Sequence, residues 1–265
     1  MLQNNLLQKV AQDRICTAIG VKVVTSNEII LLARAAGYDS VFIDMEHSVL
    51  GIENVSRLCS ASLLSGITPF VRVPYECGSG FVQRVLDGGA MGIVFPHIST
   101  AEEARRAVSI TKYPPKGQRS LTAALPQFDF QRISARDLIP QLDSIGSTVF
   151  IQIETKMCLE NIDAIAAVEG VEVLLLGAND LSLELGILGD WEHQRFQNAL
   201  ETIAMAARKS GKIFGIAGLY SRPDICKHAV KELGARYVLG HLDIGLLAIA
   251  MNKNMDQLRE LETKP

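Results

Sequence analysis

Short apolar runs alternate with longer segments of helical period along almost the whole chain, and this alternation limits the fold more than any other feature. Most runs are apolar on successive residues, as in strands that are buried on both faces. Strand and helix patterns in alternation are typical of βα units around a parallel sheet. Eight runs are expected to form strands: Ile15–Gly20, Ser40–Asp44, Pro69–Val73, Gly92–Pro96, Thr148–Ile153, Val171–Leu176, Lys212–Ala217 and Arg236–Gly240.

Segments with a helical repeat follow the expected strands. In the first of them Ile29, Ile30 and Ala33 share one face, and Gly37 provides a stop signal. Eight strands with eight helices predict a closed (β/α)₈ barrel, or TIM barrel, as a single domain over 1–265; a doubly wound open sheet is the alternative. The expected helices are Asn27–Ala36, Glu53–Leu64, Phe81–Leu86, Ala101–Ile110, Leu159–Val168, Glu192–Lys209, Pro223–Leu233 and Ile244–Leu261.

The charge balance argues against two classes of partner. With 26 Lys and Arg against 29 Asp and Glu, the chain has a net charge of −3, so we expect it to bind neither nucleic acid nor an anionic membrane. No apolar run reaches the ~18 residues of a spanning helix, and the first residues do not resemble a signal peptide. The five cysteines are scattered and never paired as C-x-x-C, which predicts reduced thiols and a cytoplasmic protein.

Charged residues stand at the ends of four expected strands. Asp44 and His47 close the second strand, Arg72 closes the third, Glu154 follows the fifth and Asp180 follows the sixth. A barrel places its chemistry at the C-terminal ends of its strands, and buried charges are costly without partners. We therefore expect these side chains to converge on one site.

Glu154 and Asp180 are the candidate metal ligands. They come from neighbouring strands and supply two carboxylates without a histidine or cysteine nearby. Hard oxygen donors suit Mg²⁺ or Mn²⁺, whose remaining positions can accept the keto and carboxylate oxygens of a 2-oxo acid. The alternative is that both are ordinary loop acids, with Asp180 capping the helix that follows.

His47 and Arg72 are candidates for proton transfer and anion binding. Histidine titrates near neutral pH, and Asp44, Glu46 or Asp87 could orient it; their spacing does not choose among them. Arg72 has apolar neighbours and requires an anion, either a protein carboxylate or a bound substrate. Three more residues at strand ends are expected to line the site: His97, His241 and Asp243.

Six short motifs occur in a fixed order, and together they resemble the HpcH/HpaI family of class II, metal-dependent pyruvate aldolases. Each motif alone is weakly specific, but the ordered set is specific, and the likeness covers about residues 17–247. The motifs are DMEHS at 44–48, VRVP at 71–74, LDGGA at 86–90, YPPKGQR at 113–119, QIET at 152–155 and GANDLS at 177–182.

The resemblance implies an enzyme that cleaves or forms 4-hydroxy-2-oxo acids, with pyruvate enolate and an aldehyde as the reacting partners. It implies Glu154 and Asp180 as ligands of Mg²⁺ or Mn²⁺, with Co²⁺ or Zn²⁺ as substitutes. His47 matches the general base, Asp87 the carboxylate that makes this histidine more basic, and Arg72 the stabiliser of the enolate.

The resemblance extends to substrate contacts and assembly. Gln152, Asn179 and Asp180 match pyruvate-contacting positions, and Asp44 matches a polar residue near the metal-bound water. Members usually form homohexamers in which the last helix, here near Ile244–Leu261, is exchanged between subunits. This chain departs from the pattern at Ala178, Ser120 and 121–130, so we expect a different pocket for the aldehyde.

Several alternatives remain open at this stage. Oxaloacetate decarboxylation, or a cyclisation of the macrophomate synthase type, would use the same metal and enolate. A citryl-CoA-type lyase is disfavoured because no CoA-binding feature is evident. A Schiff-base aldolase would need a buried lysine at a strand end, for which Lys22 and Lys156 are the candidates. The non-enzyme alternative is a barrel that binds a 2-oxo acid without catalysis.

Overall fold

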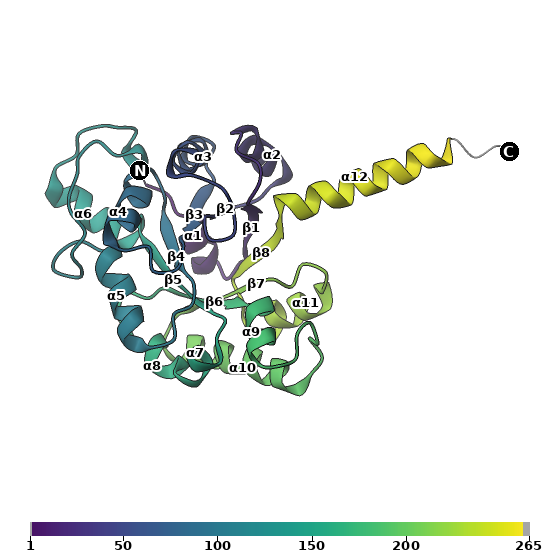
Figure 1. Cartoon of the computed structure of the whole chain (residues 1–265). Helices are drawn as coiled ribbons and strands as arrows, with labels where there is room; N and C mark the ends of the chain where they lie inside the picture. The colour runs from purple at the N-terminus through teal and green to yellow at the C-terminus, as the bar shows by residue number, and fades with distance from the viewer. Residues whose placement is uncertain (1, 262–265) are drawn as a thin grey trace.

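The computed structural model describes residues 2–261 and confirms the predicted closed barrel (Figure 1). Eight parallel strands pair in chain order and β8 closes against β1, so the doubly wound alternative is wrong. Met1 and residues 262–265 of the predicted domain lie outside the described residues. The strands are β1 (Cys16–Val21), β2 (Ser40–Asp44), β3 (Thr68–Arg72), β4 (Gly92–Phe95), β5 (Thr148–Ile153), β6 (Val173–Gly177), β7 (Ile213–Ala217) and β8 (Tyr237–Leu242).

Helices surround the barrel, and their pattern departs from the prediction in two ways. The helices α1, α6 and α9 were not expected, and the helix expected at Leu159–Val168 is divided at Asn161 into α7 and α8. The helices are α1 (Asn5–Ala11), α2 (Glu28–Ala36), α3 (Ile52–Leu64), α4 (Ser79–Asp87), α5 (Ala101–Thr111), α6 (Ala135–Ser144), α7 (Lys156–Glu160), α8 (Ile162–Ala166), α9 (Ala178–Glu184), α10 (Gln194–Lys209), α11 (Pro223–Lys231) and α12 (Asp243–Glu260), with a 3₁₀ turn at Pro126–Phe128.

Alternate residues of each strand point into the barrel, and along the strand they change from apolar to polar. Phe70 precedes Arg72 on β3, and Phe150 precedes Gln152 on β5. The rings of Phe70, Phe150 and Tyr237 pack together with centroids 4.8 to 5.9 Å apart. The interior is therefore a packed floor of aromatic and aliphatic side chains beneath the polar residues at the strand ends.

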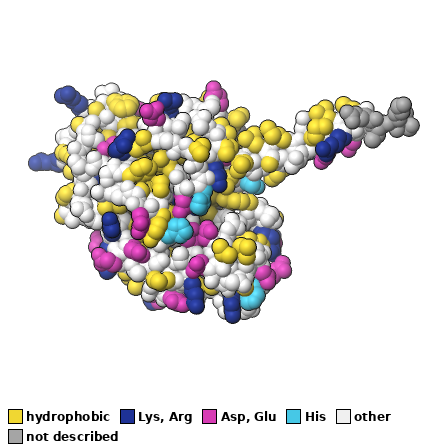
Figure 2. All heavy atoms as spheres, in the orientation of Figure 1, with side chains coloured by type: hydrophobic (Ala, Val, Ile, Leu, Met, Phe, Trp, Pro, Cys, Tyr) yellow, Lys and Arg dark blue, Asp and Glu magenta, His cyan; other side chains and the backbone are white. Residues whose placement is uncertain are grey.

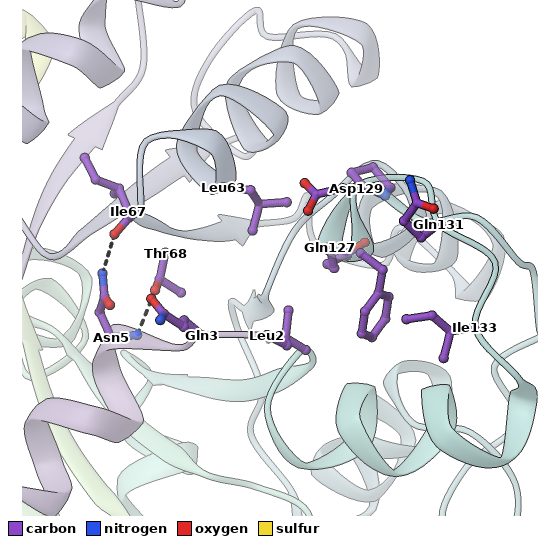
Figure 3. A pocket seen from close by; sticks show the side chains of 13 residues that line it. Leu2, Gln3, Asn5, Leu63, Ile67, Thr68, Gln127, Asp129, Gln131 and Ile133 are labelled. Carbon is purple, nitrogen blue, oxygen red and sulfur yellow. Dashed lines mark hydrogen bonds between the residues drawn. The ribbon is translucent and has the colours of Figure 1, made fainter.

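The N-terminal segment binds to the end of the barrel where the strands begin, opposite the polar strand ends. The side-chain amide of Asn4 donates to the hydroxyl of Thr148 at 3.0 Å, and the backbone N–H of Asn5 donates to the hydroxyl of Thr68 at 2.8 Å. A cavity of about 320 Å³ lies beside this segment (Figure 3). Asp129 is the one carboxylate in its lining, which has no histidine or basic residue, so it is not the candidate catalytic cavity.

The last helix, α12, leaves the barrel and projects as a separate rod (Figure 1). Among its residues Asp243 alone is buried. Of the helices in residues 2–261, none is both long and apolar enough to cross a membrane. Exposed apolar side chains run along α12: Ile244, Leu247, Ile249, Met251, Met255 and Leu258.

Candidate active site at the C-terminal end of the barrel

A cavity of about 180 Å³ opens at the C-terminal ends of the strands. Acidic and histidine side chains gather near the middle of this face of the molecule (Figure 2). Of the predicted site residues, Glu154 and Asp87 do not line the cavity, and the other six do: Asp44, His47, Arg72, Gln152, Asn179 and Asp180.

Arg72 is oriented by two carboxylates. Its Nε and Nη2 donate to Asp44 at 3.0 and 2.8 Å, and its Nη1 lies 2.9 Å from Oε2 of Glu46. The register of β2 and β3 pairs Asp44 with Arg72 directly. Burial acts to raise the pKa of Asp44, but the hydrogen bonds and charge of Arg72, with two backbone N–H groups, lower it below its usual value. The guanidinium keeps further N–H groups for a substrate anion.

A cluster of charged side chains lies beside Arg72, and we call it the second layer. It consists of Glu46, His97 and Glu154. His97 Nε2 lies 3.1 Å from Oε1 of Glu46, and its Nδ1 lies 3.5 Å from Oε1 of Glu154. The backbone N–H of His97 donates to the same Glu154 oxygen at 2.6 Å, and the Gln152 amide donates to the other. Burial raises the pKa of Glu154 despite these donors, and the charge of Glu46 adds to the increase. Carboxylate therefore exceeds fixed positive charge here.

His47 lies at the mouth of the cavity on a turn that Asp44 organises. Oδ1 of Asp44 accepts the backbone N–H groups of Glu46 and His47 at 3.0 and 3.3 Å, and the Ser48 hydroxyl donates to the Asp44 carbonyl. The His47 side chain is 55% exposed, and its Nε2 lies 3.8 Å from Oε2 of Glu46. The imidazole is thus open both to the cavity and to water.

Asp87 lies apart from His47. It ends α4, where its Oδ1 accepts a hydrogen bond from Nη2 of Arg119 at 2.7 Å. The Arg119 side chain is fully buried and packs over the ring of Tyr113 at 4.7 Å. No contact within residues 2–261 joins Asp87 to His47, so a single chain does not assemble the predicted pair.

Asn179 and Asp180 lie in the first turn of α9, which begins directly at the end of β6. The N-cap is Gly177, so the alternative role of Asp180 as a cap is wrong. A Cβ atom on Gly177 would lie 2.9 Å from Oε2 of Glu154. The absence of a side chain at this position lets the Glu154 carboxylate lie against the turn that carries Asp180.

Comparison with known proteins connects this geometry to a family. The model of the family described as HpcH/HpaI aldolase/citrate lyase matches residues 23–238, which include all eight predicted site residues. The chain belongs to the HpcH/HpaI aldolase/citrate lyase family. The resemblance predicted from the ordered motifs is confirmed.

The chain matches named relatives over nearly its full length. The 4-hydroxy-4-methyl-2-oxoglutarate aldolase of Hapsidospora irregularis is 47% identical over 247 residues, or 93% of this chain and 92% of the relative. The solved HpcH/HpaI aldolase of Desulfitobacterium hafniense has a TM-score of 0.88 and 28% identity, covering 96% of both chains. Macrophomate synthase shares the fold, with a TM-score of 0.82 and 24% identity over 98% of this chain and 91% of its own. The aldolase relatives confirm the prediction of a carbon–carbon lyase.

The carboxylates of this HpcH/HpaI chain fit a divalent cation held at an open site. No cluster of three or more histidine, cysteine or acidic side chains in the described residues has the arrangement of a metal cage. Glu154 and Asp180 offer two hard oxygen donors at neighbouring strand ends, and Mg²⁺ commonly binds through one or two carboxylates plus substrate oxygens. A bound cation would also relieve the carboxylate excess and the raised pKa of buried Glu154.

Three residues at the strand ends of this HpcH/HpaI barrel have contacts or positions that the sequence did not predict. Asp243, expected to line the site, is buried and accepts backbone N–H groups of the loop that begins at Lys22. His241 stacks on Tyr220, with ring centroids 4.8 Å apart. Tyr220 lines the cavity and was missed, although it follows β7 at the end where a barrel places its chemistry.

Proposed function

We propose that this chain is a divalent-metal-dependent aldolase that cleaves, or in reverse forms, 4-hydroxy-2-oxo acids. The observation that carries the proposal is one cavity lined by His47, Arg72, Gln152 and Asp180, with Glu154 beside it. The first substrate to test is 4-hydroxy-4-methyl-2-oxoglutarate, for which the 47% identical relative is named. Breaking its C3–C4 bond gives two molecules of pyruvate, so its second product is a 2-oxo acid rather than an aldehyde.

Four residues of the cavity have a defined role in the proposed cleavage. His47 accepts the proton of the 4-hydroxyl group as the C3–C4 bond breaks. The bonding electrons pass to the 2-keto oxygen to give pyruvate enolate, and the available N–H groups of Arg72 face that oxygen as its charge develops. Gln152 and the turn at Asn179 bind the keto-acid end of the substrate. Protonation of C3 then releases pyruvate.

Asp44 and the second layer keep the reacting groups in place. The two hydrogen bonds from Arg72 to Asp44 fix the guanidinium fork, and Asp44 also lies where the family resemblance puts a polar residue near a metal-bound water. Glu154 and Asp180 would hold the cation, Mg²⁺ or Mn²⁺ first and Co²⁺ or Zn²⁺ as substitutes. When bound, the cation supplies Lewis-acid polarisation of the 2-keto group.

The working form that we propose is a homo-oligomer, a hexamer by family resemblance, with α12 exchanged between subunits. The exposed apolar side chains along α12 support this, because exposed patches of this kind usually mark an interface. Asp87 is bound by Arg119 and makes no ion pair with His47 of the same chain. It can therefore orient a histidine only if the histidine comes from a neighbouring subunit. Light scattering measures the subunit number, and a monomer at micromolar concentration would contradict the exchange.

The remaining partners in the proposal are small molecules. They are a 2-oxo acid, pyruvate or oxaloacetate, and a carbonyl acceptor. The cysteines in the described residues are all free, which supports a reducing, cytoplasmic location. Lys156 is 65% exposed and lies outside the cavity, so a Schiff-base mechanism would have to use Lys22.

Deuterium exchange into the methyl group of pyruvate tests the proposal. The enzyme with Mg²⁺ or Mn²⁺ is expected to exchange the methyl protons, because enolisation does not need an acceptor. EDTA should abolish the exchange, and added metal should restore it. Full exchange in metal-free enzyme would contradict the mechanism, and release of carbon dioxide from oxaloacetate without aldol cleavage would make the chain a decarboxylase instead.

A further inference from the structure

One basic side chain in the cavity has no anionic partner in the described part of the chain. Lys22 follows β1, is partly buried and lines the cavity together with Arg72 and Asp180. Within residues 2–261 its ammonium group makes no hydrogen bond or ion pair, whereas Arg72 is held by carboxylates. A partly desolvated cation at a substrate cavity is a favourable position for an anionic group of a ligand.

Asp243 fixes the loop that carries Lys22. Its Oδ1 accepts the backbone N–H of Lys22 at 3.0 Å, and its Oδ2 accepts those of Val23 and Val24 at 3.0 and 2.8 Å. Because Asp243 is only 1% exposed, water competes little for these bonds. The backbone beneath Lys22 is therefore preorganised, and binding an anion requires the ordering of one side chain only.

The lining of the cavity that holds Lys22 suits a short carbon chain that ends in a polar group. Leu239 and Leu242 supply apolar surface, and Tyr220 supplies a phenol whose ring stacks on His241 at 4.8 Å and 16°. Burial raises the pKa of Tyr220 to about 12, so the hydroxyl stays protonated at neutral pH and can donate a hydrogen bond.

We propose that Lys22 binds the second carboxylate of a dicarboxylic 2-oxo acid, at the end away from the keto group. This inference rests on the proposed function, which sets the keto-acid end against Arg72, Gln152 and Asp180. Those three come from β3, β5 and the turn after β6, whereas Lys22 follows β1. The two ends of the acid thus meet separate donors, and Lys22 selects dicarboxylates over monocarboxylates of equal length.

A lysine in an aldolase cavity has one competing role, as the nucleophile of a Schiff base. In that role the Lys22 amine attacks the keto carbon and loses water to form an imine, which borohydride reduces to a stable adduct. Arginine keeps the positive charge but cannot form the imine. The Lys22→Arg variant therefore separates the two roles: it keeps carboxylate binding and abolishes a Schiff-base reaction.

Calorimetry on the intact protein with Mn²⁺ present tests the inference without turnover. The ligands are 2-oxoglutarate and 2-oxopentanoate, which share their length and keto-acid end and differ only in the terminal carboxylate. The natural chain should prefer 2-oxoglutarate by about 10- to 100-fold, as expected for a hydrogen bond to a charged group. Lys22→Met should lose most of this preference, and Lys22→Arg should keep it. Lys156→Met, a change of an exposed lysine outside the cavity, is the matched control and should behave as the natural chain.

Three outcomes overturn part of the account, and each points to a different part. No preference in the natural chain, or the same preference in Lys22→Met, removes the carboxylate subsite. A pyruvate adduct trapped on Lys22 by borohydride removes both the subsite and the metal mechanism. A retained, Lys22-dependent preference without metal-dependent methyl exchange leaves the subsite standing and removes the proposed function.

Discussion

Each end of the barrel holds a basic side chain that is largely shielded from solvent. The two differ in how completely their charges and hydrogen bonds are matched by partners. At the N-terminal end, Lys112 donates to the carbonyls of Asp143 and Ser147 and to the carboxylate of Glu172, each at 2.8 Å. Three donors meet three acceptors, so the ammonium group is saturated. The second oxygen of Glu172 accepts the backbone N–H of Val149 at 2.6 Å, which closes the cluster.

At the C-terminal end, the charges are left unbalanced. Arg72 faces Asp44 and Glu46, with Glu154 behind them, so three carboxylates surround one guanidinium group. Carboxylate is in excess of fixed positive charge, because the other basic groups beside Glu46 are two histidines, His47 at 3.8 Å and His97 at 3.1 Å. The difference separates a cluster that holds the fold together from one that, in our proposal, a cation and a substrate complete. Changes at the two ends should accordingly have different consequences.

The largest effect on turnover is expected from His47→Ala. Loss of a general base should lower kcat/KM by about 10²–10⁴-fold. Because the side chain is 55% exposed, the free energy of unfolding should change by no more than about 0.5 kcal/mol. An unchanged kcat/KM in His47→Ala would exclude His47 as the base.

Lys112→Met tests the opposite end. It removes a buried cation and leaves the partly buried Glu172 carboxylate and two backbone carbonyls without their donor, so the free energy of unfolding should fall by about 3–5 kcal/mol, as measured by urea titration. Turnover of the folded enzyme should be unaffected, because Lys112 is remote from the cavity. The double variant Lys112→Met with Glu172→Gln should recover part of the loss. A loss below about 1 kcal/mol would show that this cluster is not structural.

Arg72→Lys keeps the charge at the C-terminal end and removes the fork. The kcat should fall by about 10²–10³-fold with little change in KM, because the lost hydrogen bonds act on the developing enolate. Steady-state kinetics on 4-hydroxy-4-methyl-2-oxoglutarate measures both constants. A raised KM at unchanged kcat would instead make Arg72 a ground-state binding residue.

The smallest expected effect is on the pH dependence of stability, to which Asp44 and Glu172 contribute with opposite sign. The pKa of Asp44 is lowered in the folded chain, so its contribution to stability is present at neutral pH and is lost as the pH falls through the folded-state pKa. Burial raises the pKa of Glu172 even though Lys112 acts to lower it, so the contribution of Glu172 is present below its unfolded pKa and is lost as the pH rises. On acidification to about pH 3, the natural chain should lose stability relative to Asp44→Asn and gain it relative to Glu172→Gln. Urea midpoints measure both differences, and parallel curves would contradict the assignment.

The strands and the polar rim could be predicted because both depend on local patterns. Runs such as Ser40–Asp44 and Thr148–Ile153 have the predicted bounds, since continuous apolar residues admit few alternatives to a buried strand. Once the strands are placed, the barrel itself brings Asp44, Arg72 and Gln152 to one rim.

The contacts between strand ends could not be predicted in this way. The ion pairs of His97 with Glu46 and Glu154 depend on loop conformation, including the positive φ of 54° at His97. Asp243 and Lys22 are far apart in sequence and meet only because β8 closes against β1. Tyr220 stands in no recognisable motif, so its place could come only from the fold.

Binding of Mn²⁺ is the most direct test of the central claim, which is that the excess of carboxylates at the C-terminal ends of the strands serves to bind a cation. Calorimetry or electron paramagnetic resonance should show one Mn²⁺ per chain in the natural protein and greatly weakened binding in Glu154→Gln and Asp180→Asn. Glu172→Gln, which removes a partly buried carboxylate at the other end of the barrel, should bind as the natural chain does. Equal affinity in Glu154→Gln, Asp180→Asn and the natural chain would contradict the central claim.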